Sequence, residues 1–521
     1  MTKRTWKQTA ALLLGSAMLL SACGDGGNSG GNGNSAEPAK TNNGATGAAN
    51  GANAGDKQAE KAKITWLNIL HTASPPTDTV LNKIEELTNT DLTFSWVPDA
   101  SKEERINTSL ASDSLADIVT LTILDNSSVR SALKSGMFWD VGPFLDEFEN
   151  LSQISQDTRT SASIEGKLYG IPFQKAMARN GVVIRKDWLD KLKLPVPKTT
   201  DELMNVAKAF TEQDPDGNGQ KDTTGFVDRS DLVFGAFKTL GSYFGTPNIW
   251  KEENGKAIAE FETESYVNTM NYMKQLYDNG YINQDFAVTA KTDQQQKFAQ
   301  GKAGIYVGAL FDSKNLLNMA KGVQDNMQLV MVNDMTAPGQ QRAIWSGNNG
   351  IGGLLSFPRS EVKDEAELKR VLQFVNDLMS EEAYALMTYG IEGTHYTKDA
   401  EQAVTISNTD LWQQEVQPFA ASRPKEVGYK IHDADPLKKE ADKLIADNAK
   451  YAVLNPFYSL EAPTWSSQGS ELQKIITDAT YKYILGKATL DDFKAAVENW
   501  KKSGGASVIS EYEAAFAKVQ G

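Results

Sequence analysis

Residues 182–226 read VVIRKDWLDKLKLPVPKTTDELMNVAKAFTEQDPDGNGQKDTTGF and combine a strand, a helix, a polar loop and a second strand-like run. The run GVVIR (181–185) is apolar and β-branched, which indicates a buried strand. Residues 200–212 carry apolar side chains on one helical face, and Thr199 with Glu202 forms a capping box at its start. A strand, a helix and a further strand in succession are typical of an α/β fold.

The same alternation runs along the chain from residue 64 onward. Other apolar runs indicate strands at 64–70, 91–97, 117–123, 303–308 and 328–332. Amphipathic segments indicate helices at 264–279, 364–379, 470–485 and 490–502. Strands separated by helices predict βαβ units and a mainly parallel sheet. The residues after about 380 are mostly helical in pattern.

The polar loop at 214–222 has the spacing of a calcium-binding loop. Oxygen-bearing side chains fall at its positions 1, 3, 5 and 9, and Gly219 stands at position 6, where the chain must turn sharply. A hard cation prefers oxygen ligands from one short, flexible loop. The expected ligands are the side chains of Asp214, Asp216, Asn218 and Asp222 and the backbone carbonyl of Gln220.

The loop departs from a complete EF-hand at its last position. Position 12 is Gly225 instead of a bidentate glutamate, so one ligand has to come from elsewhere, either Thr223 or an acid further along. The alternative is a polar turn that binds no metal. Because the loop connects a helix to a strand, we expect the calcium to be structural.

Composition excludes several classes of protein. Acidic residues outnumber basic ones by 67 to 53, and the formal net charge is −14. Nucleic-acid binding depends on clustered lysine and arginine, so we expect no nucleic-acid partner. The single cysteine excludes an intramolecular disulfide, and the three histidines are too few and scattered for most zinc or haem sites.

The first 22 residues have the pattern of a secretory signal. Lys3, Arg4 and Lys7 precede an apolar run at 10–20, which is shorter than the roughly 20 residues that span a bilayer. The run ends in Leu-Ser-Ala-Cys, which resembles the lipobox of bacterial lipoproteins. This motif predicts that Cys23 is lipidated and becomes the first residue of the mature chain. The alternative is an ordinary signal peptide with a chance cysteine.

Residues 23–62 have the composition of a tether. They are rich in glycine, asparagine and alanine and have almost no large apolar side chain. Such a segment cannot bury enough surface to offset its ordering entropy, so we expect it to be disordered. The lipid on Cys23 would then be the only membrane anchor.

Residues 182–226 resemble the extracellular solute-binding protein family 1, the lipoproteins that serve ABC importers in Gram-positive bacteria. These are similar to maltose- and alginate-oligosaccharide-binding proteins. Further matches occur in family order at 117–119 (DIV), 165–172 (EGKLYGIP), 298–304 (FAQGKAG), 390–396 (GIEGTHY) and 463–466 (PTWS). The resemblance covers about residues 64–515.

This resemblance implies the type II periplasmic-binding-protein fold, or Venus flytrap, in which two α/β lobes enclose a ligand. A ligand that contacts both lobes stabilises the closed state, which an importer can recognise. The resemblance places the hinge crossovers near 175–180, 332–336 and 380. It assigns 64–178 and 335–380 to the N-terminal lobe, and 181–332 and 381–521 to the C-terminal lobe.

The resemblance also suggests residues that contact the ligand. Trp465 and Phe311 align with sugar-stacking tryptophans of maltose-type proteins, although phenylalanine at 311 weakens any link to maltose itself. Trp345 lies in the polar, glycine-rich loop AIWSGNNG, while His71 and Asp125 follow strands whose ends face the expected cleft. For each aromatic residue, the alternative is packing in the core.

The function implied is that of a monomeric, lipid-anchored receptor on the extracellular face of the cell membrane. It would bind an oligosaccharide or another polar small solute, deliver it to the permease subunits of an ABC importer and carry out no catalysis. Two alternatives differ in kind: a surface carbohydrate-active enzyme, and a peptide-binding or sensory lipoprotein. The sequence contains no HExxH motif and no P-loop, which weakens the enzyme alternative.

Overall fold

Two separate sheets organise the part of the chain that the computed structural model describes, residues 61–72, 74–122, 124, 126–425 and 433–520. These residues belong to one compact unit, residues 60–521. The signal segment, Cys23 and nearly all of the tether lie outside the described residues. No helix among the described residues is both long enough and apolar enough to cross a bilayer.

The first sheet has five strands in the order β2-β1-β3-β12-β4. Their bounds are β1 (Ala62–Leu70), β2 (Thr90–Pro98), β3 (Ile118–Leu121), β4 (Ile171–Gln174) and β12 (Ile351–Ser356). Strand β1 is parallel to β2 and β3, whereas β12 is antiparallel to both of its neighbours. The helices grouped with this sheet are α1 (Asp78–Thr88), α2 (Lys102–Ser112), α3 (Ser127–Lys134), α4 (Gln156–Ala162), α11 (Glu365–Leu378), α12 (Glu381–Tyr389), α13 (Thr409–Glu415) and α14 (Gln417–Ala420).

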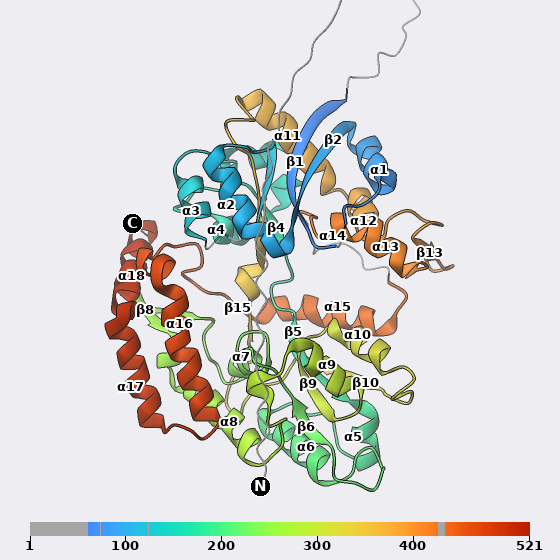
Figure 1. Cartoon of the computed structure of the whole chain (residues 1–521), viewed down its shortest axis with the longest axis vertical. Helices are drawn as coiled ribbons and strands as arrows, with labels where there is room; N and C mark the ends of the chain where they lie inside the picture. Colours follow the sequence, from blue (N-terminus) through green and yellow to red (C-terminus); the bar gives the residue numbers. More distant parts are fainter. Residues whose placement is uncertain (1–60, 73, 123, 125, 426–432, 521) are drawn as a thin grey trace, which may run out of the picture. The chain divides into compact units, whose positions relative to one another are not determined.

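The second sheet has four strands in the order β10-β5-β9-β6 (Figure 1). Their bounds are β5 (Asn180–Arg185), β6 (Thr224–Val227), β9 (Ala303–Ala309) and β10 (Leu329–Val332). The helices grouped with it are α5 (Lys186–Leu192), α6 (Thr200–Glu212), α7 (Ala236–Tyr243), α8 (Glu264–Asp278), α9 (Lys291–Ala299), α10 (Asp312–Ala320), α15 (Pro436–Asn448), α16 (Pro463–Ile484), α17 (Leu490–Trp500) and α18 (Ala506–Gln520).

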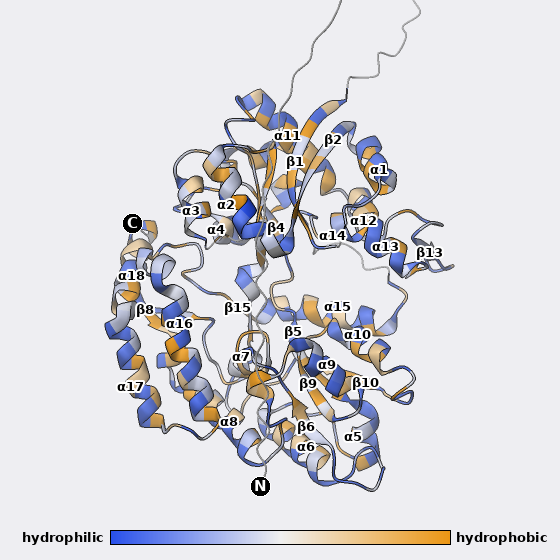
Figure 2. Ribbon diagram, in the orientation of Figure 1, coloured by the Kyte–Doolittle hydropathy of each residue, from blue (hydrophilic) through white to orange (hydrophobic). Residues whose placement is uncertain are grey.

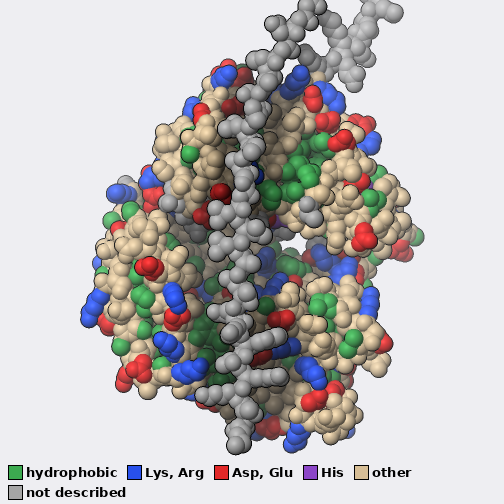
Figure 3. All heavy atoms as spheres, in the orientation of Figure 1, with side chains coloured by type: hydrophobic (Ala, Val, Ile, Leu, Met, Phe, Trp, Pro, Cys, Tyr) green, Lys and Arg blue, Asp and Glu red, His purple; other side chains and the backbone are tan. Residues whose placement is uncertain are grey.

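Three two-stranded pairs complete the fold: β7 (Trp250–Glu253) with β8 (Lys256–Ala259), β11 (Ile344–Trp345) with β15 (Ala452–Val453), and β13 (Tyr396–Lys398) with β14 (Val404–Ile406). Each large sheet has its own hydrophobic core, which defines a first and a second lobe. The outer helices α16 and α17 alternate apolar and polar residues, as helices packed on a core do (Figure 2). The visible face of the described residues intersperses acidic and basic side chains (Figure 3).

The α/β fold class is confirmed, but the expected mainly parallel sheet is wrong for both lobes: two of the four pairings in the first sheet and two of the three in the second are antiparallel. Strand β5 is antiparallel to both β9 and β10, and only β6 with β9 is parallel. The reason is connectivity. The chain enters the second lobe from β4 across residues 175–179 and not through a helix within the same sheet.

Two of the expected lobe boundaries are also wrong. Met335, Ile344 and Trp345 pack in the second core, so the chain returns to the first lobe only at β12, about 15 residues later than expected. Residues 381–420, expected in the C-terminal lobe, pack on the first core through Met387 and Phe419. Burial of these apolar side chains holds the segment in the first lobe.

Gly304 in β9 allows helices α5 and α6 to approach the second sheet closely. A Cβ atom at this position would lie 2.2 Å from Phe210 Cδ2 and 2.6 Å from Trp188 Cε3. Those two buried rings meet edge to face with centroids 5.3 Å apart. Position 304 therefore has no room for a side chain.

We expect Gly304→Ala to lower the free energy of unfolding by about 1–3 kcal/mol or more, because the added methyl group overpacks the core. Urea unfolding followed by circular dichroism measures this change. The matched control is Gly347→Ala, whose Cβ would find its nearest neighbour at 3.8 Å, on Trp345. Equal stability of the two variants would contradict the packing argument.

Candidate functional site

A cavity of about 380 Å³ lies between the two lobes. Thr122, Leu124, Arg130 and residues 161–164 line it from the first lobe. The second lobe supplies most of the aromatic surface, and the segments 345–352 and 455–466 close the remaining side. Apolar walls with a few fixed polar groups are the usual composition of a small-molecule site.

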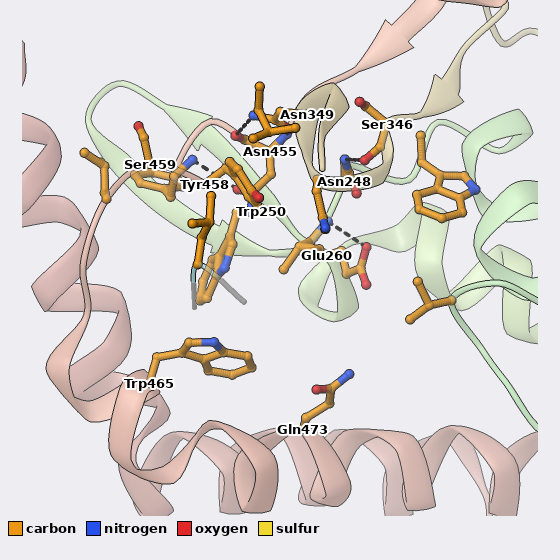
Figure 4. A pocket seen from close by; sticks show the side chains of 18 of the residues that line it. Asn248, Trp250, Glu260, Ser346, Asn349, Asn455, Tyr458, Ser459, Trp465 and Gln473 are labelled. Carbon is orange, nitrogen blue, oxygen red and sulfur yellow. Dashed lines mark hydrogen bonds between the residues drawn. The ribbon is translucent and has the colours of Figure 1, made fainter. Parts of the chain in front are cut away.

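Two segments that link the lobes, residues 345–352 and 453–466, meet at the cavity wall, where asparagine side chains hold them together (Figure 4). The Nδ2 of Asn349 donates to the Asn455 carbonyl at 2.9 Å, and the Asn455 N–H donates back to Asn349 Oδ1 at 2.8 Å. The Nδ2 of Asn248 donates to the carbonyls of Ser346 at 2.7 Å and Val453 at 3.0 Å. These bonds provide partners for backbone carbonyl and N–H groups where the chain passes between the lobes.

Trp465 lies in the first turn of α16, and its indole faces the cavity, as does Gln473 further along the helix (Figure 4). The indole is partly buried. Gly469, one turn on, leaves it room, because a Cβ there would lie 3.0 Å from the ring. The helix therefore presents the ring to the cavity without burying it completely.

Trp345 also lines the cavity, but its indole is 6 % exposed and is anchored in the second core. Its Nε1 donates to Thr239 Oγ1 at 3.1 Å, and its ring meets Phe234 edge to face with centroids 5.6 Å apart. Packing in the core, the alternative for this residue, accounts for most of its surface. Only a small part of the ring can contact a ligand.

A second cavity of about 460 Å³ adjoins the start of β5 and the end of β9. Phe311 lines this cavity and not the first, with 41 % of its surface exposed. Phe234, 43 % exposed, lines both cavities. The structure therefore brings Trp465 and Trp345 to one cavity, and Phe311 to another that shares the wall formed by Phe234.

His71 lines neither cavity. Its Nδ1 lies 3.5 Å from Asp99 Oδ1, and the same carboxyl accepts a hydrogen bond from Lys102 Nζ at 2.6 Å. Burial lowers the pKa of His71, assisted by Lys102 and Lys175 and opposed by Asp99. A contact between His71 and a ligand stays a prediction. Asp125 lies outside the described residues, although Leu124 beside it lines the first cavity.

An ion-paired contact joins the lobes at the rim of the first cavity. Lys134 in α3 pairs with Glu461, which precedes α16, and with Glu165 at 2.9 Å. These hydrogen bonds, with Glu461 as the stronger influence, raise the pKa of Lys134. Arg130 stands beside them, 4.0 Å from Glu461, and its Nη1 is buried without a hydrogen bond.

The calcium-type loop follows α6 and precedes β6, and Thr199 and Glu202 form the expected capping box at the start of α6. Oδ1 of Asp214 accepts hydrogen bonds from the N–H groups of Gly217 and Asn218, at 2.9 and 3.1 Å. Its Oδ2 accepts from Gly219 at 3.1 Å. The first loop residue therefore fixes the turn that follows it.

Carboxylates converge within this loop on the side-chain amide of Asn218, whose Nδ2 donates to Asp216 at 2.9 Å and to Asp222 at 3.1 Å. Gln220 N–H donates to Asn218 Oδ1, and Lys302 Nζ donates to Asp222 at 2.9 Å.

Burial and the nearby Asp214 raise the pKa of Asp216, which indicates crowded carboxylates. Among the described residues, no cluster of three acidic, histidine or cysteine side chains is already arranged around a metal. The oxygen donor set nevertheless fits a hard cation.

Packing explains why the loop lacks its twelfth ligand. A Cβ at Gly225 would lie 2.5–2.6 Å from the backbone and Cβ of Ala207 in α6, so no side chain fits there. Thr223 is a poor substitute, because its buried hydroxyl donates to the Phe210 carbonyl at 2.7 Å. Of the two sources expected for the missing ligand, an acid elsewhere is the better one.

Sequence reasoning missed Arg179, Phe234, Trp250 and Asn248, all of which line a cavity. Arg179 had a usable signal, since it lies within the expected first crossover, directly before a buried strand. Phe234 and Trp250 look like ordinary core residues in the sequence. Their position depends on how α7 and the β7–β8 hairpin pack.

The fold and the cavity between its lobes define a solute-binding protein. The family model for the bacterial extracellular solute-binding protein matches residues 73–385, and the chain belongs to this family. It is 46 % identical over 462 residues to the polygalacturonan/rhamnogalacturonan-binding protein YtcQ of Bacillus subtilis, covering 88 % of this chain and 92 % of YtcQ. It is 32 % identical over 440 residues to lipoprotein LipO of the same organism, covering 83 % and 87 %.

Solved structures share the fold at lower identity. An HMO-binding, ABC-transporter-associated solute-binding protein from Bifidobacterium longum infantis matches with TM-score 0.64 at 18 % identity, over 88 % of this chain and 99 % of its own. An EF-hand mutant of Streptococcus pneumoniae FusA, in complex with fructo-nystose, matches with TM-score 0.61 at 18 %, over 88 % and 99 %. The alginate-binding protein AlgQ2, solved without calcium ion, matches with TM-score 0.61 at 16 %, over 88 % and 98 %. The family and the neighbours named here are described as binding proteins.

Proposed function

We propose that this protein is the lipid-anchored extracellular receptor of an ABC importer and that its solute is an oligosaccharide. The observation that carries the proposal is the cavity between the lobes, where Trp465 and Phe234 offer ring surface beside fixed asparagine side chains. Sugars combine apolar faces with hydroxyl groups, so ring faces and amides suit them. The relative YtcQ is named for pectic polysaccharides, which makes a pectin-derived oligosaccharide the first solute to test.

Thermal shift and calorimetry against a panel of pectic, neutral and peptide ligands test this function. If the protein binds a carbohydrate and does not convert it, the receptor function is supported. Turnover would support the surface-enzyme alternative, and a response only to peptides would support the peptide-binding alternative. The proposal further includes a monomer that docks on permease subunits in its ligand-bound, closed state.

Trp465→Ala should weaken carbohydrate binding by about 1–3 kcal/mol, roughly tenfold to a hundredfold, because the sugar loses a stacking surface. Titration calorimetry measures the affinity, and thermal melting measures stability. Trp412→Ala is the matched control, since Trp412 is a half-buried helical tryptophan that lines neither cavity and donates to the Thr388 carbonyl. The control should lower melting but not affinity. Intact affinity with a collapsed melting point in Trp465→Ala would assign this residue to the core.

The proposal includes one structural calcium ion in the loop 214–222. The side chains of Asp214, Asp216, Asn218 and Asp222 and the Gln220 carbonyl would hold it. Its charge would relieve the repulsion among the crowded carboxylates and fix the connection between α6 and β6. The oxygen spacing and the crowding of the carboxylates support this ion. Two structural neighbours point the same way, since one is an EF-hand mutant of FusA and the other is AlgQ2 in a form without calcium ion.

Chelation should lower the melting temperature, because a metal that binds only the folded loop stabilises it by mass action. Asp214→Ala should abolish the response to chelator and added calcium. Asp278→Ala is the control, since Asp278 is a half-exposed aspartate that pairs with Lys274 away from the loop. A response in wild-type protein that persists in Asp214→Ala would place the metal elsewhere. Absence of calcium by elemental analysis, with no chelator response, would mean a metal-free turn.

The membrane attachment rests on the Leu-Ser-Ala-Cys motif that ends at Cys23. Cys23→Ala should release the protein from membrane fractions into the medium, because one thioether-linked lipid group is the only anchor expected. Immunoblotting of the fractions measures the distribution, and Ser21→Ala is a control that keeps the thiol. Equal membrane retention of Cys23→Ala and wild-type protein would contradict lipid anchoring.

A further inference from the structure

The second cavity contains an arginine, Arg179, whose guanidinium forms no hydrogen bond with the residues that the structure describes. Arg179 is exposed and lies directly before β5, and its carbonyl accepts the Leu310 N–H at 2.9 Å, which ties it to the end of β9. Its guanidinium stands 5.9 Å from the centroid of the Phe234 ring and 5.7 Å from that of Phe311. Among the described residues, its side chain has no carboxylate partner and no hydrogen-bond acceptor, although a guanidinium carries five N–H donors.

The other charged groups of this cavity are already engaged. Arg229 is buried, donates to the Phe234 carbonyl at 2.6 Å and lies 3.5 Å from Asp231. Asp231 accepts from the N–H groups of Val233 and Phe234. Lys291 lies 3.7 Å from Asp312, whose Oδ2 also accepts from Tyr306. Three cations therefore face two anions, and the surplus positive charge lies on Arg179.

Phe234 and Phe311 add a second, independent feature. Both are among the few large apolar side chains of the described residues that stay exposed, and they flank the guanidinium. Exposed aromatic rings beside a cavity indicate a ligand surface. A planar guanidinium held against rings is preorganised to bind a carboxylate with two N–H groups. A ligand that matches both features carries a carboxylate on a ring with apolar faces.

We propose that Arg179 with Phe234 and Phe311 forms a subsite for the carboxylate of a uronic-acid residue in the bound oligosaccharide. This inference rests on the proposed oligosaccharide-binding function and deepens it, since it names the side chain that selects an acidic sugar. Phe234 lines both cavities, so a chain of sugars can extend from Trp465 in the first to Arg179 in the second.

Trigalacturonate and its fully methyl-esterified form are the probes, because esterification keeps the rings and removes the negative charge. Wild-type protein should bind the acid more tightly than the ester, and salt should weaken the acid complex. Arg179→Gln should weaken acid binding roughly tenfold to a hundredfold, leave ester binding unchanged and remove most of the salt dependence. The affinity of Arg179→Lys for the acid should lie between those of wild-type protein and Arg179→Gln, because lysine keeps the positive charge but lacks the planar pair of N–H donors.

The matched control is Arg359→Gln. Arg359 is an exposed arginine held 3.7 Å from the centroid of the Trp139 ring, and it lines neither cavity. The control changes the net charge equally and should leave both affinities intact.

Acid binding that is unchanged in Arg179→Gln, or an equal loss for acid and ester, overturns the subsite while the oligosaccharide function stands. The subsite is also overturned if wild-type protein binds neutral oligosaccharides but not trigalacturonate. If wild-type protein binds no carbohydrate of the panel, the proposed function fails and the subsite with it.

Discussion

The insertion of β12 between β3 and β4 is the constraint on which the two-lobe structure depends. This strand is hydrogen-bonded on both sides in the first sheet, although the chain before it belongs to the second core. Glycines allow the close fit: a Cβ at Gly353 would lie 2.3 Å from the Leu121 carbonyl oxygen, and a Cβ at Gly170 2.3 Å from that of Leu355. Because the first sheet needs this late strand, the chain must pass between the lobes more than once. The passing segments then become the wall of the cavity.

Much of the fold follows from local sequence patterns. The strand at 181–185 and the helix at 200–212 occur within one residue of their expected bounds, since each combines a clear apolar period with a cap or flanking turn. β12 was not expected, because Ile-Gly-Gly-Leu-Leu-Ser is short and rich in glycine and has no period to recognise. The lobe boundary expected near 335 came from the family resemblance, and only the sheet partners of β12 reveal that the chain returns to the first lobe later.

The candidate site could be expected only in part. Trp465 was expected because the family resemblance aligns it with a sugar-stacking tryptophan, and its ring lines the first cavity. Trp345 was expected at the cleft because of its polar, glycine-rich loop, yet its indole N–H is used inside the second lobe. Phe234 could not be singled out, because its exposure arises from the way α7 meets the linking segment that contains Trp345. Contacts between distant segments decide such positions, and local patterns do not encode them.

The close contact between Gly225 and Ala207 has a consequence for how this loop can evolve. In EF-hand proteins, the residue at the twelfth position is a major means of adjusting affinity, because it supplies two oxygens at once. Here the backbone of a neighbouring helix occupies that space, so a single codon change to glutamate would disrupt the core before it could improve binding. If the loop binds calcium as proposed, selection on its affinity acts on the nine leading residues and on side chains that approach from outside, such as Lys302 on Asp222. A calcium ion in this loop would then have a fixed structural role and not that of a tunable sensor.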